Sequence, residues 1–125
     1  YYNLQSLREE ADFTEKQIHV VLEAISKTGQ NIIIEGGLDT ENERNAVRKL
    51  LKICGYNPTL VWIQTDINTI KARLKLKFRS VARAKEEYDS RIRAMEAPAE
   101  TEKPIILSGK HTFDTQLSHV LSQLS

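Results

Sequence analysis

The sequence has little of several features that would each mark a class of protein. It holds one cysteine, Cys54, so no disulfide can close within the chain. No apolar run approaches the ~20 residues that a membrane-spanning helix needs. The 18 lysines and arginines are balanced by 17 acidic residues, so the whole chain creates no field that would attract nucleic acid or an anionic membrane. These absences predict a cytoplasmic protein with no membrane partner.

The length of 125 residues fits one domain, so we expect a single domain over residues 1–125. The sequence begins with Tyr1 and Tyr2 and has no initiator methionine. We therefore expect it to be a piece of a longer protein.

The residues at 31–40, N-I-I-I-E-G-G-L-D-T, form the stretch around which the rest is organised. A continuous run of three isoleucines is typical of a strand buried on both faces, as in parallel sheets covered by helices. The run ends at Glu35 and a Gly-Gly turn, and ligands bind at the carboxyl ends of such strands. The plainer alternative is that Glu35 only ends the strand and meets solvent.

Strand patterns alternate with helical patterns along the chain. We expect strands at 31–35, 59–64 and 105–107, with helices before, between and after them. This alternation predicts an α/β fold with a three-layer parallel sheet and flanking helices. Three strands are few for a sheet of this kind.

Basic residues dominate the segment 71–93, which contains nine lysines and arginines and only three acidic residues. A helical region this polar either lies on the surface or moves over a ligand, and residues 75–97 have the character of a lid. The two prolines and three charged residues at 97–104 then predict a loop.

Four segments together resemble P-loop kinases, most nearly small kinases of the polynucleotide-kinase and zeta-toxin type. They are I-I-I-E-G-G-L-D-T-E-N-E-R, G-Y-N-P-T-L-V-W-I-Q-T-D, I-K-A-R and I-I-L-S-G-K-H-T-F, within residues 14–125. The phosphate-binding signature G-x-x-x-x-G-K-[ST] is absent. The resemblance therefore implies a truncated P-loop fold, the carboxyl-terminal portion of a kinase without its phosphate loop.

The resemblance implies roles for particular residues. Glu35 stands where the family ends a strand with an acidic residue, usually Asp, which holds the water shell of Mg²⁺ or accepts a proton from a hydroxyl. Asp39 and Arg44 fall where the family contacts its substrate, and Arg73 stands where the lid of the family begins. Lys77 stands where the family more often has a second arginine.

Two further groups complete the implied site. Lid arginines stabilise charge on the transferring phosphoryl group, and a loop after the last strand packs on the nucleotide base. The implied catalytic residues are Glu35, Asp39, Arg79 and Arg83, the substrate-binding residues are Arg44 and Arg73, and the nucleotide-binding residues are Gly109, Lys110 and His111. Each has a plainer alternative, since basic runs usually form a solvated face and His111 beside Lys110 can simply be exposed.

Two functions follow from these patterns. In the first, the chain belongs to a kinase that transfers a phosphoryl group from ATP, with Mg²⁺, to a hydroxyl of a small molecule or polynucleotide, and it is inactive without the missing phosphate loop. In the second, the chain is a non-enzymatic module that binds an acidic partner or RNA through its basic helix. Against the second stand the near-zero net charge and the lack of aromatic residues among the basic ones.

The resemblance also implies a gap in the sheet. In P-loop kinases the strand with the phosphate loop lies between the strands expected here at 31–35 and 59–64. Without it, unpaired strand edges would pair with each other or recruit another chain. We therefore expect either direct pairing of these strands or a strand-mediated or swapped homodimer.

Overall fold

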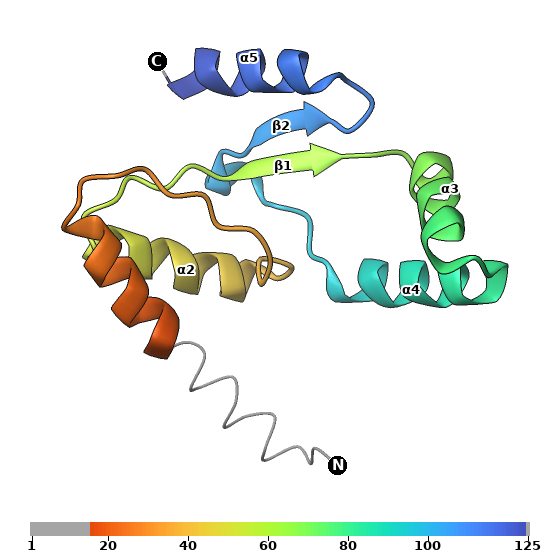
Figure 1. Cartoon of the computed structure of the whole chain (residues 1–125), viewed down its shortest axis with the longest axis horizontal. Coiled ribbons are helices and arrows are strands. Elements are labelled where there is room, and N and C mark those ends of the chain that lie inside the picture. Colours follow the sequence, from red (N-terminus) through yellow and green to blue (C-terminus); the bar gives the residue numbers. More distant parts are fainter. Residues whose placement is uncertain (1–15, 125) are drawn as a thin grey trace. The chain divides into compact units, whose positions relative to one another are not determined.

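The computed structural model describes residues 16–124 and forms an α/β protein that is mostly helical (Figure 1). Its sheet has two parallel strands. The chain forms two compact units, one made of residues 16–37 and Asn42–Pro58 and the other of Leu38–Glu41 and residues 59–124. The division of the chain that we expected from the sequence, one domain with a lid-like region at 75–97, stays a prediction.

The first unit consists of a helix at residues 16–26, an irregular segment, and helix α2, Glu41–Ile53, which starts in the second unit. Its core contains Leu22 and Leu51, which are 5% and 9% exposed. Gly55 adopts a φ of 85°, a left-handed conformation that suits glycine at a helix end. The hydroxyl of Tyr56 then donates to the carbonyl of Gln30, at 3.3 Å, and fastens the end of α2 to the irregular segment.

The second unit contains the sheet. Strand β1, Val61–Gln64, pairs in parallel with strand β2, Ile105–Ser108, and Val61 lies opposite Ile105. Helix α5, Phe113–Leu124, packs against β2, where Leu107 is buried (Figure 1). Both strands end at the same edge of the sheet, because parallel strands run in one direction.

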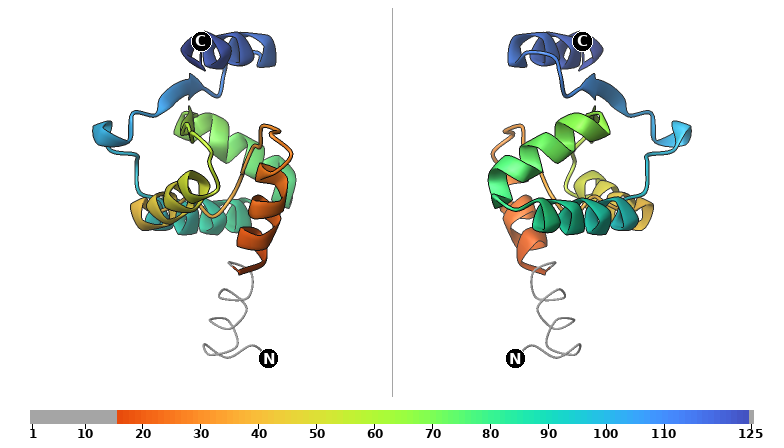
Figure 2. Two further views of the ribbon diagram at one scale, coloured as in Figure 1. Left: turned by 90° about the vertical axis from the view of Figure 1, so that its left-hand side faces the viewer. Right: turned by 90° about the vertical axis from the view of Figure 1, so that its right-hand side faces the viewer.

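A helical hairpin connects the two strands. It consists of α3, Ile67–Phe78, and α4, Val81–Ala94, followed by the short 3₁₀ helix η1, Glu100–Glu102. Arg79 ends α3 in the left-handed conformation, with a φ of 50°, and Ser80 caps α4 by accepting a hydrogen bond from the Arg83 N–H. The two helices contact each other and diverge at an angle from the turn that joins them (Figure 2), and Ala84 is buried in α4.

The prediction of a strand at 31–35 is wrong. These residues form no strand in the structure, and Ile33 is 98% exposed. A β-branched run has the side chains for a strand, but a strand exists only where a neighbour supplies hydrogen bonds and packing. The predicted strands at 59–64 and 105–107 are confirmed, with small shifts in their bounds, and the three-layer arrangement stays a prediction.

Candidate functional site

The carboxyl edge of the sheet brings together the residues that follow β1 and β2. The N–H of Gly109 donates to the carbonyl of Gln64 at 2.6 Å, which extends the ladder past the end of β2. Thr65 and Asp66 therefore lie beside Gly109 and Lys110. In open α/β sheets this edge is where ligands bind, so it is the first candidate for a site.

The close approach of the chain at residue 109 to residues 64 and 65 requires a glycine at position 109. A Cβ atom built on Gly109 would lie 1.8 Å from Oγ1 of Thr65 and 3.2 Å from the carbonyl oxygen of Gln64. No side chain fits between the two chain segments without displacing one of them. The structure therefore assigns Gly109 a packing role at the strand ends.

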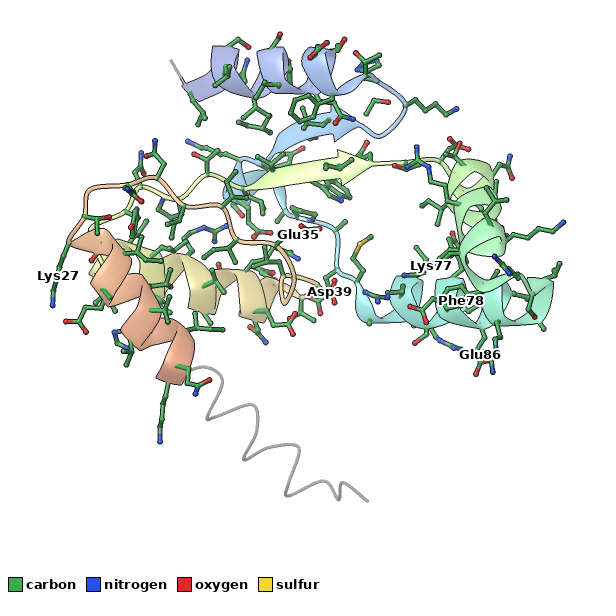
Figure 3. All side chains as sticks on the ribbon, in the orientation of Figure 1. Lys27, Glu35, Asp39, Lys77, Phe78 and Glu86 are labelled. Atoms are coloured by element: carbon green, nitrogen blue, oxygen red, sulfur yellow. The ribbon has the colours of Figure 1, made fainter. Side chains whose placement is uncertain are left out.

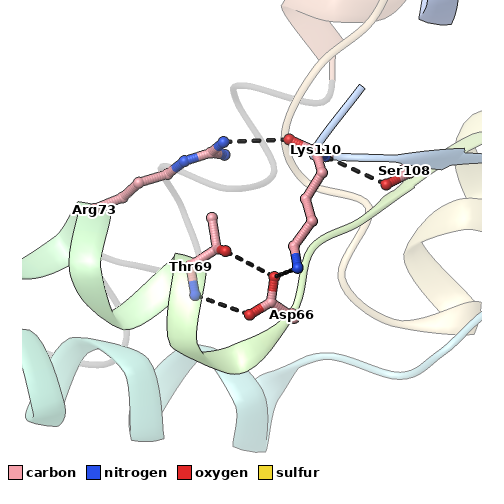
Figure 4. Close-up of polar contacts among 6 residues, drawn as sticks. Asp66, Thr69, Arg73, Ser108 and Lys110 are labelled. Atoms are coloured by element: carbon pink, nitrogen blue, oxygen red, sulfur yellow. Dashed lines mark hydrogen bonds and ion pairs between the residues drawn. The ribbon is translucent and has the colours of Figure 1, made fainter. Parts of the chain in front are cut away.

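Asp66 joins the two strand ends through its carboxylate. It is the N-cap of α3 and accepts hydrogen bonds from the N–H of Thr69 at 3.0 Å and from its hydroxyl at 2.7 Å (Figure 4). The same carboxylate forms an ion pair with Nζ of Lys110 at 3.0 Å. The hydrogen bonds from Thr69, together with the ammonium group of Lys110, hold the pKa of Asp66 well below its usual value of 3.8.

The loop after β2 is held by further hydrogen bonds. The guanidinium of Arg73 donates to the carbonyl of Gly109 at 3.2 Å, one turn of α3 beyond Thr69 (Figure 4). From the other side, the amide of Gln116 in α5 donates to the carbonyls of Ser108, at 2.8 Å, and His111, at 3.3 Å. Helices α3 and α5 thus both fix the S-G-K-H loop, whose His111 side chain is exposed.

The predicted lid arginines lie at the turn of the helical hairpin. Arg79 is the C-cap of α3, and Arg83 lies in the first turn of α4; both side chains are exposed. Among their basic neighbours, Lys77 and Lys71 lie over aromatic rings, at 5.5 Å from Phe78 and 5.1 Å from Tyr88 (Figure 3). The two rings of the hairpin are therefore engaged by its own lysines.

Asp39 is held at the other end of α4. The N–H of Glu96 donates to the carbonyl of Asp39 at 2.8 Å, and the carboxylate of Glu96 accepts the N–H of Glu41 at 2.9 Å. The pKa of Arg91 is raised, mainly by its hydrogen bond to Glu87 and in smaller part by the charge of Asp39. The 14 residues of α4 span about 21 Å. The structure therefore places Asp39 and Arg83 near opposite ends of one helix.

Glu35 and Arg44 belong to the first unit. Glu35 is exposed in the irregular segment (Figure 3), whereas Arg44 in α2 is 4% exposed and engaged in interactions. A substrate could reach Arg44 only if its surroundings opened. Seven of the nine predicted residues thus belong to the second unit, where the structure brings Arg73, Gly109 and Lys110 together, with His111 next in the loop.

Glu35 is the residue expected from the sequence to contact the water shell of Mg²⁺. Proteins bind this ion through one or two carboxylates together with substrate phosphates and water. Within residues 16–124, no cluster of three or more His, Cys, Asp or Glu side chains could hold a metal ion. The role of Glu35 at the water shell of Mg²⁺ stays a prediction. None of the helices described here has the length and apolar character to cross a membrane.

Comparison of the sequence and structure with protein-family models, curated proteins and solved structures found no match. The case for a function therefore rests on the geometry of the chain itself.

The sequence analysis did not single out Asp66 as the partner of Lys110. The signal was present, because each residue follows a predicted parallel strand within a few positions, and such strands end at one edge. No sequence pattern indicated the role of Glu96, because its hydrogen bond with Glu41 joins residues 55 positions apart.

The pH dependence of stability tests the Asp66 cluster. Because folding lowers the pKa of Asp66, its carboxylate stabilises the fold fully above the usual value of 3.8 and progressively less as the pH falls through the lower folded-state pKa. We expect Asp66→Ala to be less stable than the wild type at neutral pH, with a difference that shrinks below about pH 4. Urea unfolding at a series of pH values measures this.

Lys110→Met is the matched control, because it removes the ion pair and keeps the cap. It should give a smaller loss of the same sign. A gap between wild type and Asp66→Ala that is constant down to about pH 2 would contradict the assignment.

Replacing Gly109 tests the close approach of the strand ends. We expect Gly109→Ala to lower the free energy of unfolding by about 1–3 kcal/mol, the usual cost of forcing extra atoms into a packed site. In a Thr65→Ala background, which lacks the nearest atom, the same change should cost less. Chemical denaturation of the four proteins gives both values, and equal costs in the two backgrounds would show that Thr65 is not the obstacle.

Proposed function

We propose that this chain is the nucleotide-base and lid portion of an ATP-dependent phosphotransferase of the P-loop kinase type. The observation that supports it most is the S-G-K-H loop at the carboxyl edge of the sheet. Arg73, expected at the opening of the lid, donates to the carbonyl of Gly109 in the loop expected at the nucleotide base. A lid helix and a base-contacting loop would need such a connection to act on one nucleotide.

In this proposal each group has a separate task. The loop of Gly109, Lys110 and His111 supports the base of ATP, and the bound Mg²⁺ supplies charge neutralisation at the phosphates. Arg79 and Arg83, exposed at the hairpin turn, stabilise the negative charge on the γ-phosphoryl group as it passes to the acceptor hydroxyl. Glu35 or Asp39 accepts the proton that the hydroxyl loses.

The proposal also requires a movement. Arg79 and Arg83 lie near the opposite end of α4 from Asp39, about 20 Å away along the helix. Transfer between groups this far apart needs the hairpin to swing toward the substrate. Lids of this kind are common in phosphotransferases, where they also exclude water. A bend at Arg79 alone would leave Arg83 and Asp39 at the two ends of α4, so the movement also requires the hydrogen bonds of Glu96 to Asp39 and Glu41 to open.

The chain alone should bind ATP weakly, because no sequence of the form G-x-x-x-x-G-K-[ST] is present to cradle the phosphates. We expect titration with Mg-ATP, followed by NMR of backbone amides, to give a dissociation constant of roughly 1 mM or weaker. The shifts should centre on residues 109–111. Arg73→Ala should weaken binding several-fold, whereas Arg93→Ala, which removes an equal exposed charge from α4, should not.

Two results would contradict the proposal. A micromolar dissociation constant would mean that the phosphates are held without the missing loop. Shifts confined to residues 75–85 and abolished by moderate salt would instead favour the alternative, an acidic partner or RNA bound by the exposed lysines and arginines of the hairpin. The rings of Phe78 and Tyr88, already covered by lysines, make that alternative the weaker one for single-stranded RNA.

A further inference from the structure

Strand β1 has one paired edge and one open edge. The N–H of Ile105 donates to the carbonyl of Leu60 at 2.8 Å, and that of Gly109 to Gln64 at 2.6 Å. In a parallel ladder alternate residues face the neighbour, so residues 60, 62 and 64 face β2. Val61 and Ile63 therefore direct their N–H and C=O groups away from β2. In the part of the chain that the structure describes, no backbone hydrogen bond reaches these four groups.

The open edge lacks two features that usually protect one, a charged residue and a proline. No charged residue or proline lies within residues 59–65, and the side chains of Val61 and Ile63 are 39% and 56% exposed. The outer edge of β2 differs, because the carbonyl of Ser108 there accepts hydrogen bonds from Gln116 and from the N–H of His111. On the outer edge of β2 the carbonyl of Ser108 is thus occupied, whereas all four outward backbone groups of Val61 and Ile63 stay open among residues 16–124.

We propose that the open edge of β1 pairs with β1 of a second copy, antiparallel, about a twofold axis that passes beside Trp62. In this register Val61 faces Ile63 of the second copy. Residues opposed in this way exchange both N–H···O=C bonds. Two such pairs give four hydrogen bonds, which satisfy all four open groups on each chain. The two sheets join into one sheet of four strands.

The sequence of β1 permits pairing with a second copy. In this register Trp62 lies opposite itself on the axis, Val61 lies opposite Ile63, and no charge within residues 59–65 repels its own copy across the axis. Trp62 would face Trp62 at a position without hydrogen bonds, where side chains lie closest, and cross-strand aromatic pairs add about 0.2–1 kcal/mol in sheets. This inference does not depend on the proposed kinase function.

The mass of the protein in solution tests the pairing. Light scattering after gel filtration, over concentrations up to about 1 mM, should show the mass rising from 14.3 kDa toward twice that value. Ile63→Lys places a charge at the open edge and should raise the dissociation constant of the dimer at least about tenfold. Ile106→Lys is the matched control, because Ile106 is 51% exposed and lies on the neighbouring strand, not on the open edge of β1. It should leave the dimer intact.

Three results would overturn the proposal. They are a wild type that remains monomeric at about 1 mM, a dimer that survives Ile63→Lys, and equal loss of the dimer in both lysine variants. A third variant, Ile33→Lys, tests whether the exposed residues 31–35 of a second copy fill the edge instead. It should dimerise as the wild type does, and its loss of dimer would also count against β1 self-pairing.

A measurement on the unmodified chain covers the case in which Ile63→Lys fails to fold. In the dimer the N–H groups of Val61 and Ile63 are hydrogen-bonded, so their hydrogen exchange should slow as protein concentration rises. The N–H of Ile105, bonded to Leu60 within one chain, is the internal reference. Exchange at Val61 and Ile63 that is independent of concentration would contradict the proposal.

Discussion

The parallel pairing of β1 with β2 is the constraint on which the second unit depends. It brings the residues after each strand to one edge, where Gly109 approaches Thr65 too closely for any side chain. The ion pair between Asp66 and Lys110 and the hydrogen bond from Arg73 to Gly109 are possible only because the strands end together. Asp66 also begins α3, so the same carboxylate fixes the direction in which the hairpin leaves the sheet. The local geometry of the candidate site thus follows from a non-local pairing.

The hairpin is anchored at its two ends and exposed at its turn. Asp66 and Arg73 fasten the start of α3 to the loop after β2, and Glu96 fastens the chain after α4 to Asp39 and Glu41. Arg79 lies between the two helices, away from both anchors. The basic residues of the turn therefore lie away from both anchors, while the loop after β2 is held by α3 and α5. Both proposed functions, a lid and a surface for an acidic partner, fit this arrangement, and they differ in the salt dependence of binding.

The parts of the structure that could be predicted from the sequence are those set by local pattern. The apolar alternation in T-L-V-W-I-Q, the run I-I-L before S-G-K-H, and the helical period from Phe113 onward lie where they were expected. The strand at 31–35 was predicted from the same kind of signal and is absent, because three isoleucines supply side chains but not a neighbouring strand. The contacts of Glu96 with Asp39 and Glu41 depend on which distant segments meet, and residue spacing does not indicate that. For the same reason the sequence could suggest Glu35, Asp39 and Arg83 as one site, although Asp39 and Arg83 lie near opposite ends of α4.

Hydrogen exchange at Gly109 tests the central claim most directly. Its N–H is bonded to the carbonyl of Gln64, beyond the last residue of β2, so it reports whether the two strand ends are joined at the edge where the candidate site lies. We expect the Gly109 amide to be protected to the same degree as that of Ile105, which is bonded to Leu60 at the other end of the ladder. Protection at Ile105 with free exchange at Gly109 would show that the strands separate before their carboxyl ends, and the cluster of Asp66, Arg73 and Lys110 would then have no common support.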